Sequence, residues 1–263
     1  MSARSSSRRC DPGGSSTSSA YLAEAFHSWQ GEGLHVGRRQ LFLRFAECNL
    51  RCAYCDTTEA YERKAEFTFE GRDGKKARAA NPVTATEMLS LIETHGEDVG
   101  CCREVALTGG EPLLWWRFLR EFLPRLRRTG RRTALETNGT LPEALLSVID
   151  DVDVIAMDVK LASTAGQASP EEEAKRFLAT ALAAEVFVKV VVGPKTTGEE
   201  MEWVAGIVRS VDARIPVVVQ PVTGKDGRPE APPRKVDALA RGLLGRVRDV
   251  RVIGQVHKFL GMR

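Results

Sequence analysis

The sequence of 263 residues contains no apolar run that approaches the roughly 20 residues needed to span a membrane. Its charges nearly cancel, since 38 Lys and Arg residues face 35 Asp and Glu residues and leave a net charge of +3. That balance is too mild to indicate a nucleic-acid partner. Six cysteines are too few, in a chain of this length, for a disulfide framework. We therefore expect no membrane partner and no nucleic-acid partner.

The first 20 residues differ from the rest in composition. Residues 1–20 hold eight serines and three arginines with almost no apolar side chains. Such a segment cannot bury enough surface to offset the entropy lost on ordering, so we expect a disordered tail. Residues 21–263 are long enough for one large core, and we expect them to form a single α/β domain.

Strand and helix patterns alternate along residues 21–263, which is typical of an α/β fold with parallel strands and outer helices. Thr84 and Glu87 form the expected capping box of one helix, and Pro124 is expected to interrupt or kink another. The expected strands are residues 39–45, 104–107, 132–135, 152–157, 186–192, 216–219 and 250–253. The expected helices are residues 84–95, 113–128, 171–184, 199–210 and 236–244.

Residues 61–81 do not fit the alternation. They are rich in charged side chains and contain glycine, and Phe67 and Phe69 alternate within them. We interpret this segment as an insertion into the domain and expect it to form a hairpin.

Polar segments follow several of the expected strands. In α/β sheets and barrels the ligand site lies at the carboxyl ends of the strands, so we expect these segments to meet at one mouth. They are residues 48–55, 108–111, 136–139 and 158–160, with the tail after residue 253.

Three cysteines, Cys48, Cys52 and Cys55, lie within eight residues in a C-x3-C-x2-C arrangement, with no fourth cysteine nearby. Thiolates are the usual ligands of iron–sulfur clusters, and three of them leave one iron of a four-iron cluster open to a small molecule. The alternative is a zinc site completed by His27 or His35. A thiolate-bound cluster needs a reducing compartment, so we expect a cytoplasmic protein.

Two further cysteines, Cys101 and Cys102, are adjacent to each other just before an expected strand. We interpret them as buried or incidental thiols.

Four short motifs together resemble the radical S-adenosylmethionine (radical SAM) superfamily: the cysteine run with Tyr54 before its last cysteine, and residues 108–112, 136–140 and 158–160. The resemblance implies a partial, TIM-like barrel. It also implies that the three cysteines hold a [4Fe–4S] cluster and that SAM binds the open iron. The SAM contacts it implies are Gly110, Glu136, Asp158, Val159 and Lys160. Taken singly, each of the last three motifs is equally an ordinary turn or a solvated strand end.

The segments around the cysteines narrow the resemblance further. Residues 26–33 contain the run Gln-Gly-Glu-Gly, residues 42–44 precede the first cysteine, residues 55–57 read Cys-Asp-Thr, and residues 255–261 close the chain. Together they resemble the 7-carboxy-7-deazaguanine synthase family. The resemblance implies a carbon–nitrogen lyase. It would convert 6-carboxy-5,6,7,8-tetrahydropterin to 7-carboxy-7-deazaguanine and release ammonia, in the biosynthesis of queuosine and related nucleosides.

The same resemblance assigns roles to individual residues. It places the substrate against Trp29, Gln30, Gly31, Arg44 and Thr108. A guanidinium group such as that of Arg44 suits the carboxylate that this pterin carries.

The resemblance also assigns further partners. It implies that the hydroxyl of Thr57 ligates Mg²⁺, a metal that favours hard oxygen ligands. It further implies a homodimer and an electron donor such as flavodoxin or ferredoxin. It gives Gln255 and His257 no firm role. No catalytic side chain is assigned, because the cluster and SAM carry the chemistry.

Two other functions stay open at this point. One is a different small radical SAM enzyme, such as an activase that places a glycyl radical on a partner protein. The other is a non-catalytic module that binds zinc or a cluster.

Overall fold

A computed structural model describes residues 18–262 of the chain. The predicted disorder of residues 1–17 therefore lies outside the described residues. Ser19–Ala20 forms strand β1 and pairs antiparallel with β6, Val83–Thr84. The predicted tail is thus wrong for Ser19 and Ala20, because their backbone groups find partners in β6.

The elements alternate between strand and helix along most of the chain. The larger strands are β2 (Leu22–Trp29), β3 (Arg39–Phe45), β4 (Glu66–Glu70), β5 (Lys76–Ala80), β7 (Glu104–Gly109), β8 (Arg132–Thr137), β9 (Val154–Val159), β10 (Glu185–Val192), β11 (Val217–Pro221) and β12 (Val250–Val252). The α-helices are α1 (Ala85–His95), α2 (Trp116–Arg128), α3 (Pro142–Leu146), α4 (Ala162–Ala165), α5 (Glu171–Ala181), α6 (Gly198–Val211), α7 (Pro233–Leu243) and α8 (Val256–Phe259). Short 3-10 helices are η1 (Gly33–His35), η2 (Thr58–Tyr61), η3 (Pro112–Trp115) and η4 (Ile149–Asp151).

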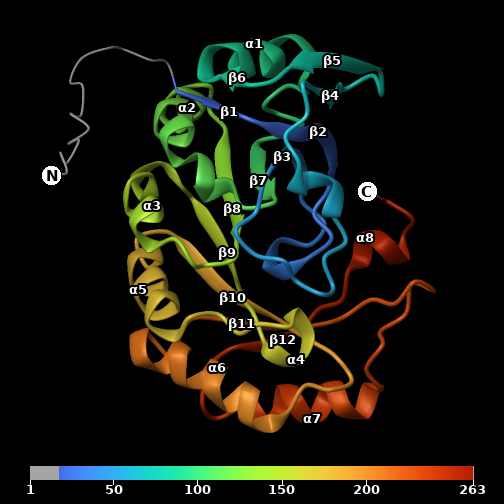
Figure 1. The fold of residues 1–263 in the computed structure, drawn as a ribbon, viewed down its shortest axis with the longest axis vertical. Helices are drawn as coiled ribbons and strands as arrows, with labels where there is room; N and C mark the ends of the chain where they lie inside the picture. Colours follow the sequence, from blue (N-terminus) through green and yellow to red (C-terminus); the bar gives the residue numbers. More distant parts are fainter. Residues whose placement is uncertain (1–17, 263) are drawn as a thin grey trace, which may run out of the picture.

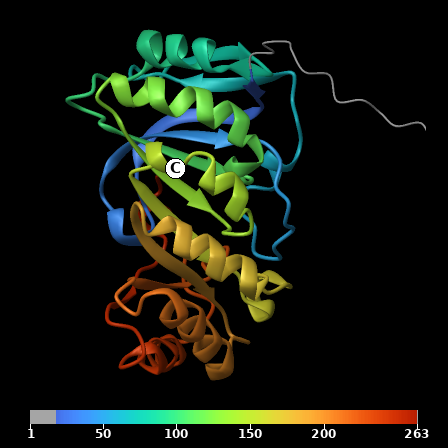
Figure 2. The same ribbon diagram turned by 90° about the vertical axis from the view of Figure 1, so that its left-hand side faces the viewer.

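One ten-stranded sheet organises the chain, in the order β12-β11-β10-β9-β8-β7-β3-β2-β4-β5. All strands from β12 to β3 run parallel, and β2 is antiparallel to β3. The sheet stays open between β12 and β5. Figure 1 shows α2, α3, α5, α6 and α7 along its outer side, with α8 away from them. Figure 2 shows the same helices stacked over the strands. This is the expected partial barrel.

The parallel part of the sheet follows the sequence prediction closely. β3 has the predicted bounds, and each later strand overlaps its predicted range. Thr84 caps α1, and Glu87 returns a hydrogen bond to the Thr84 backbone, so the capping box is confirmed. By contrast, α2 continues through Pro124, and the break in the predicted helix falls at its start, where η3 gives way to α2.

The sequence analysis does not predict β2. The strand mixes charged and small residues with few β-branched ones, so it carries a weak strand signal. Leu22 and Ala25 are buried, while Glu24 and Phe26 line a cavity. The strand therefore contacts both the hydrophobic core and the cavity.

The predicted hairpin within residues 61–81 is present. β4 pairs antiparallel with β5, and β4 also pairs in parallel with β2, so the hairpin extends one edge of the sheet. Phe67 and Phe69 are buried in the main core. No helix within residues 18–262 is long and apolar enough to cross a membrane.

His35, at the end of η1, makes part of the stability depend on pH. Its Nε2 lies 2.9 Å from Glu185 and its Nδ1 lies 3.6 Å from Glu104. The carboxylates of Glu104 and Glu185 raise the pKa of His35 above its ordinary value of 6.5, against the opposing effect of burial.

We predict the sign of this pH dependence. Because the folded-state pKa is raised, the stabilisation by His35 is complete below about pH 6.5 and is lost as pH rises through the higher folded value. The difference in unfolding free energy between the wild type and His35→Gln should therefore shrink from pH 6 to pH 9, measured by urea denaturation. A difference that grows over this range would contradict the assignment.

Candidate active site

A cavity of about 560 Å³ opens at the carboxyl ends of the parallel strands. The predicted convergence of the polar segments is confirmed, because each of them contributes to the cavity wall. The predicted site residues that line it are Trp29, Gln30, Gly31, Arg44, Cys48, Cys52, Cys55, Thr57, Thr108, Gly110, Glu136, Asp158 and Lys160.

Val159 is the exception among the predicted site residues. Its side chain is fully buried in the main hydrophobic core and does not line the cavity. Side chains alternate between the two faces of a strand, so Asp158 faces the cavity from the end of β9 and Val159 faces the core.

The three loop cysteines lie at the cavity, each half-buried. Burial raises the pKa of the Cys48 and Cys52 thiols. Within residues 18–262, one group of three potential metal ligands has its ligand atoms within 4.8 Å of one another. That group does not include the three loop cysteines. The loop sulfur atoms are therefore more widely spread than that. Zinc would draw them to about 3.8 Å, whereas a cluster binds each thiolate to a different iron.

The histidines proposed as zinc ligands are held elsewhere. Neither His27 nor His35 lines the cavity. His27 Nε2 accepts a hydrogen bond from the Glu97 backbone N–H at 3.2 Å, and His35 lies between two carboxylates. The alternative of a zinc site with three cysteines and one of these histidines is therefore wrong.

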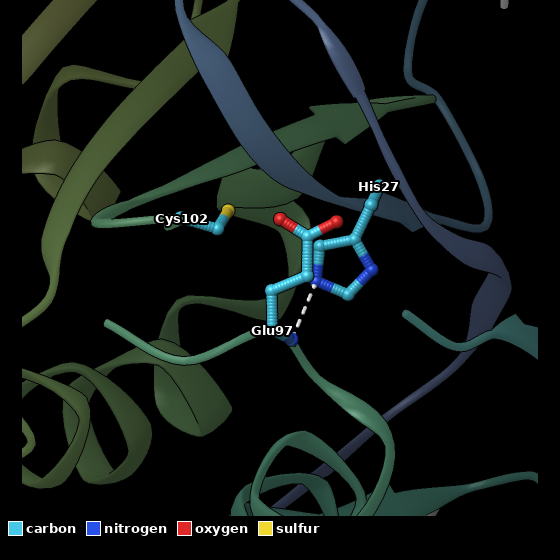
Figure 3. Close-up of side chains that lie close together, drawn as sticks. All are labelled: His27, Glu97 and Cys102. Carbon is cyan, nitrogen blue, oxygen red and sulfur yellow. Dashed lines mark hydrogen bonds between the residues drawn. The ribbon is translucent and has the colours of Figure 1, made fainter. Parts of the chain in front are cut away.

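His27, Glu97 and Cys102 do come close to one another in a second cluster (Figure 3). Arg39 already pairs with both oxygens of the Glu97 carboxylate. Burial raises the pKa of Cys102 to about 11, so its thiol stays protonated at neutral pH. The lone pair of His27 Nε2 accepts the Glu97 N–H. Glu97 and His27 thus already have hydrogen-bond partners, and the Cys102 thiol is protonated.

The glycines of the Gly-Gly-Glu motif let two loops touch. Gly109 has a φ of +116°, and a Cβ there would lie 2.5 Å from the backbone of Phe45. A Cβ on Gly110 would lie 1.8 Å from the Glu47 carbonyl oxygen. The backbone N–H groups of Gly110 and Glu111 donate to the carbonyls of Phe45 and Glu47. These glycines therefore bind the β7 loop to the start of the cysteine loop.

Glu111 is buried beneath the cavity and does not line it. Its carboxylate accepts hydrogen bonds from the backbone N–H groups of Leu113 and Asn138 and from the Thr137 hydroxyl, at 2.8–3.1 Å. Burial raises its pKa. The acidic residue of the motif thus joins the ends of β7 and β8.

We predict a specific effect of filling the space at Gly110. Gly110→Ala would push a methyl group into the Glu47 carbonyl, so unfolding free energy should fall by about 3 kcal/mol or more, with loss of cluster loading. The matched control is Gly206→Ala in α6, where an added Cβ meets nothing within 4 Å. That change should stabilise the helix by about 0.5–1 kcal/mol. Equal thermal unfolding of both variants would contradict the close approach.

The predicted substrate residues line the same cavity as the cysteines. Arg44 Nε donates to Glu24 at 2.9 Å, and its guanidinium lies over the Phe26 ring. That hydrogen bond uses Nε, and Arg44 lines the cavity, where its guanidinium can meet a ligand. Thr108 Oγ1 donates to Glu136 at 2.7 Å, and both line the cavity.

Gln30 holds Glu136 from behind through a buried chain of amides. Gln30 Nε2 donates to Glu136 at 2.8 Å and to Gln40 at 3.0 Å, while its oxygen accepts the Glu32 N–H. Gln40 in turn donates to Glu104. Both Nε2 hydrogens of Gln30 are therefore committed, and the side chain acts mainly to orient Glu136.

We predict that this chain contributes to stability. Gln40→Met removes both hydrogen-bonding groups and leaves Gln30 and Glu104 with unpaired buried atoms. Because an unpaired buried polar group costs about 1–3 kcal/mol, urea denaturation should show a loss of about 2 kcal/mol. Unchanged stability would show that the neighbouring groups find other partners.

A charged cluster around Lys160 borders the cysteine loop. Lys160 Nζ lies 3.0 Å from Asp158 and donates to the Tyr54 hydroxyl at 2.9 Å. Although burial lowers the pKa of Lys160, Asp158 raises it above its ordinary value, so the side chain stays charged. Thr57 Oγ1 lies 3.7 Å from Cys55 Sγ.

The segment after β12 closes the cavity at the cysteine loop. Lys258 Nζ lies 2.6 Å from Asp56, and Gln255 donates to Glu32 at 2.8 Å. A Cβ on Gly31 would collide with His257, at 2.1 Å from its Nδ1. The tail therefore packs directly on the Gln-Gly-Glu-Gly segment, which explains why a glycine stands there.

Sequence reasoning missed several residues of the cavity wall, among them Glu32, Lys189 and Gln220. Lys189 is a single lysine within an otherwise apolar stretch of β10, and Gln220 is a buried amide near the end of β11. A polar side chain in a buried strand was the available signal, because such a residue needs a partner.

Comparisons with known proteins agree with this geometry. A sequence model of the Radical SAM superfamily matches residues 44–207. A protein named 7-carboxy-7-deazaguanine synthase from Geobacter sulfurreducens is 38% identical over 246 residues, covering 92% of this chain and 97% of the relative. Another of that name, from Methanothermobacter thermautotrophicus, is 33% identical over 263 residues and covers 93% and 98%.

The chain belongs to the 7-carboxy-7-deazaguanine synthase family within the Radical SAM superfamily. Membership of this superfamily implies a [4Fe–4S] cluster and SAM as cofactors. The donor set of three thiols at an open cavity fits that cluster.

Solved structures support the fold. QueE from Escherichia coli aligns with a TM-score of 0.60 at 21% identity, covering 91% of this chain and 95% of that chain. A radical SAM methyltransferase from Sphaerobacter thermophilus aligns with a TM-score of 0.56 at 14% identity, covering 82% and 66%. These likenesses confirm the partial barrel.

Proposed function

We propose that this protein converts 6-carboxy-5,6,7,8-tetrahydropterin to 7-carboxy-7-deazaguanine with release of ammonia. The single observation that carries the proposal is one cavity lined both by the cysteine loop and by Gln30, Arg44 and Thr108. Family membership supports it, because the relatives over more than nine-tenths of the chain carry the name of this activity. The product belongs to the biosynthesis of queuosine and related nucleosides.

Cys48, Cys52 and Cys55 would hold the cluster through their thiolates. When the cluster and SAM are bound and one electron arrives, they supply a 5′-deoxyadenosyl radical. Burial raises the pKa of the Cys48 and Cys52 thiols, so cluster loading must release protons from them.

The cavity wall beside the cysteines would bind SAM. Glycine at position 110 lets the main chain lie close to a ligand. Glu136, Asp158 and Lys160 supply charged groups at the strand ends. Val159 can take part only through its main chain, since its side chain faces the core.

The substrate would lie against Trp29, Gln30, Gly31, Arg44 and Thr108. The guanidinium group of Arg44 suits a carboxylate, which accepts two parallel hydrogen bonds from such a group. Gln30 would contribute mainly its main chain, because its side-chain donors are committed to Glu136 and Gln40.

Thr57 would provide a hydroxyl ligand for Mg²⁺. The ion favours oxygen donors and keeps several waters, and the position of Thr57 on the cavity wall supports access to substrate oxygens. Cleavage of SAM takes one electron, so we also propose a donor such as flavodoxin or ferredoxin. A homodimer and a cytoplasmic location complete the proposal and rest on the family resemblance and on the need for reduced thiols.

The test is a turnover assay of the full chain with reconstituted cluster, reductant, SAM, Mg²⁺ and the carboxypterin. We predict a deazapurine and ammonia in equal amounts. Arg44→Gln should raise the KM for the pterin by roughly tenfold to a hundredfold, because a charge-assisted pair is worth about 1.5–3 kcal/mol.

The matched control for this variant is Arg72→Gln, an exposed arginine 3.9 Å from Asp98. Its KM should equal that of the wild type. SAM cleavage by the wild type without consumption of the pterin would reject the proposed substrate, whereas equal KM values for both variants would reject only the role of Arg44.

A further inference from the structure

Lys189 is a charged side chain in the middle of an apolar strand. β10 reads Glu-Val-Phe-Val-Lys-Val-Val-Val, and its last residues are buried. The Lys189 side chain is only 14% exposed, yet it lines the cavity. A buried lysine is costly unless anionic groups surround it, so its surroundings should reveal its role.

The Lys189 ammonium group joins two carboxylates. Its Nζ lies 2.7 Å from Glu32 and 3.4 Å from Asp158. Glu32 follows directly on Gln30 and Gly31, the segment proposed to meet the substrate. Asp158 stands at the end of β9 in the segment proposed to meet SAM. One ammonium group therefore contacts both proposed binding regions.

We infer that Lys189 is a positioning residue that fixes Glu32 and Asp158 relative to each other and thereby couples SAM cleavage to turnover of the pterin. The inference rests on the proposed function. It goes beyond it by naming a side chain that belongs to neither binding segment.

The electrostatics of the cavity support this role. Burial alone would lower the pKa of Lys189, but Glu32 and Asp158 raise it well above its ordinary value. Burial likewise opposes ionisation of Glu32, yet Lys189, with Gln255 and Gln220, holds the pKa of that carboxyl at about 2. Lys189 and Glu32 therefore both stay charged at neutral pH. Removing the lysine would leave two buried carboxylates without their shared cation.

Neighbouring side chains cannot replace Lys189. Lys160 also pairs with Asp158, but its other contact is the Tyr54 hydroxyl. Gln220 and Gln255 donate to Glu32 as neutral amides. Among residues 18–262, Lys189 is thus the cation that contacts both Glu32 and Asp158.

The experiment compares Lys189→Gln with Lys175→Gln in the reconstituted full chain. Lys175 pairs with Glu171 and Glu172 on α5, away from the cavity, and gives the same chemical change. We expect K189Q to raise the KM for the pterin by roughly tenfold or more, as loss of one partner from a buried ion pair requires. It should also form several times more 5′-deoxyadenosine per product. K175Q should match the wild type in both quantities.

A thermal-unfolding cycle gives a readout that does not depend on activity. K189Q should lower the melting temperature, and adding Glu32→Gln should restore part of the loss, because a neutral amide no longer needs the cation. If K189Q does not acquire a cluster, Lys189→Arg is tested instead. Its wider guanidinium keeps the charge but cannot place a single nitrogen between both carboxylates, so the ratio of 5′-deoxyadenosine to product should still rise.

The outcomes separate the two ideas. A wild-type enzyme that makes no deazapurine overturns the proposed function. A wild-type enzyme that turns over normally, while K189Q or K189R keeps its KM and its ratio of 5′-deoxyadenosine to product, overturns the role of Lys189. The role of Lys189 is also overturned if the changes in melting temperature caused by K189Q and by Glu32→Gln simply add in the double variant.

Discussion

The backbone contact between the loop after β7 and the start of the cysteine loop is the constraint on which the site depends. Glu47 has a φ of +65° and accepts the Glu111 N–H, and Gly110 is so close that no side chain fits. Glu111 then ties this junction to the end of β8 through three hydrogen bonds. Because the contacts are made by main chain and by one buried carboxylate, they fix where the cysteines stand without occupying the cavity.

Ion pairs also position the polar side chains of the cavity wall. Lys189 and Lys258 each pair with a carboxylate from a distant part of the chain, and Lys160, directly after β9, pairs with Asp158 at the end of that strand. Such pairs contribute little net stability, since desolvation offsets most of the attraction. They do determine where the carboxylates point. The site is therefore held both by hydrogen bonds and by ion pairs.

The sequence predicted most of the parallel sheet, because buried parallel strands are apolar along their whole length and give a strong local signal. It missed β2, whose composition mixes charged and small residues. The sequence also predicted a tail that includes β1. The two residues of β1 pair with the distant strand β6 and have no strand pattern of their own. For the site, the strand-end motifs placed nearly every predicted residue at the cavity. Val159 is the exception, because side chains alternate between the two faces of β9 and Val159 faces the core.

By itself the sequence determined the three thiols, the open ligand position and the glycines at the strand ends, because each is a property of residue type and spacing. Only the tertiary structure decided which charges meet. Lys189 and Glu32 are separated by 157 positions, and Lys258 and Asp56 by 202. Their pairing depends on the order of strands in the sheet and on the return of the tail. An ion pair between distant segments is a contact in space, and no local pattern in the chain encodes it.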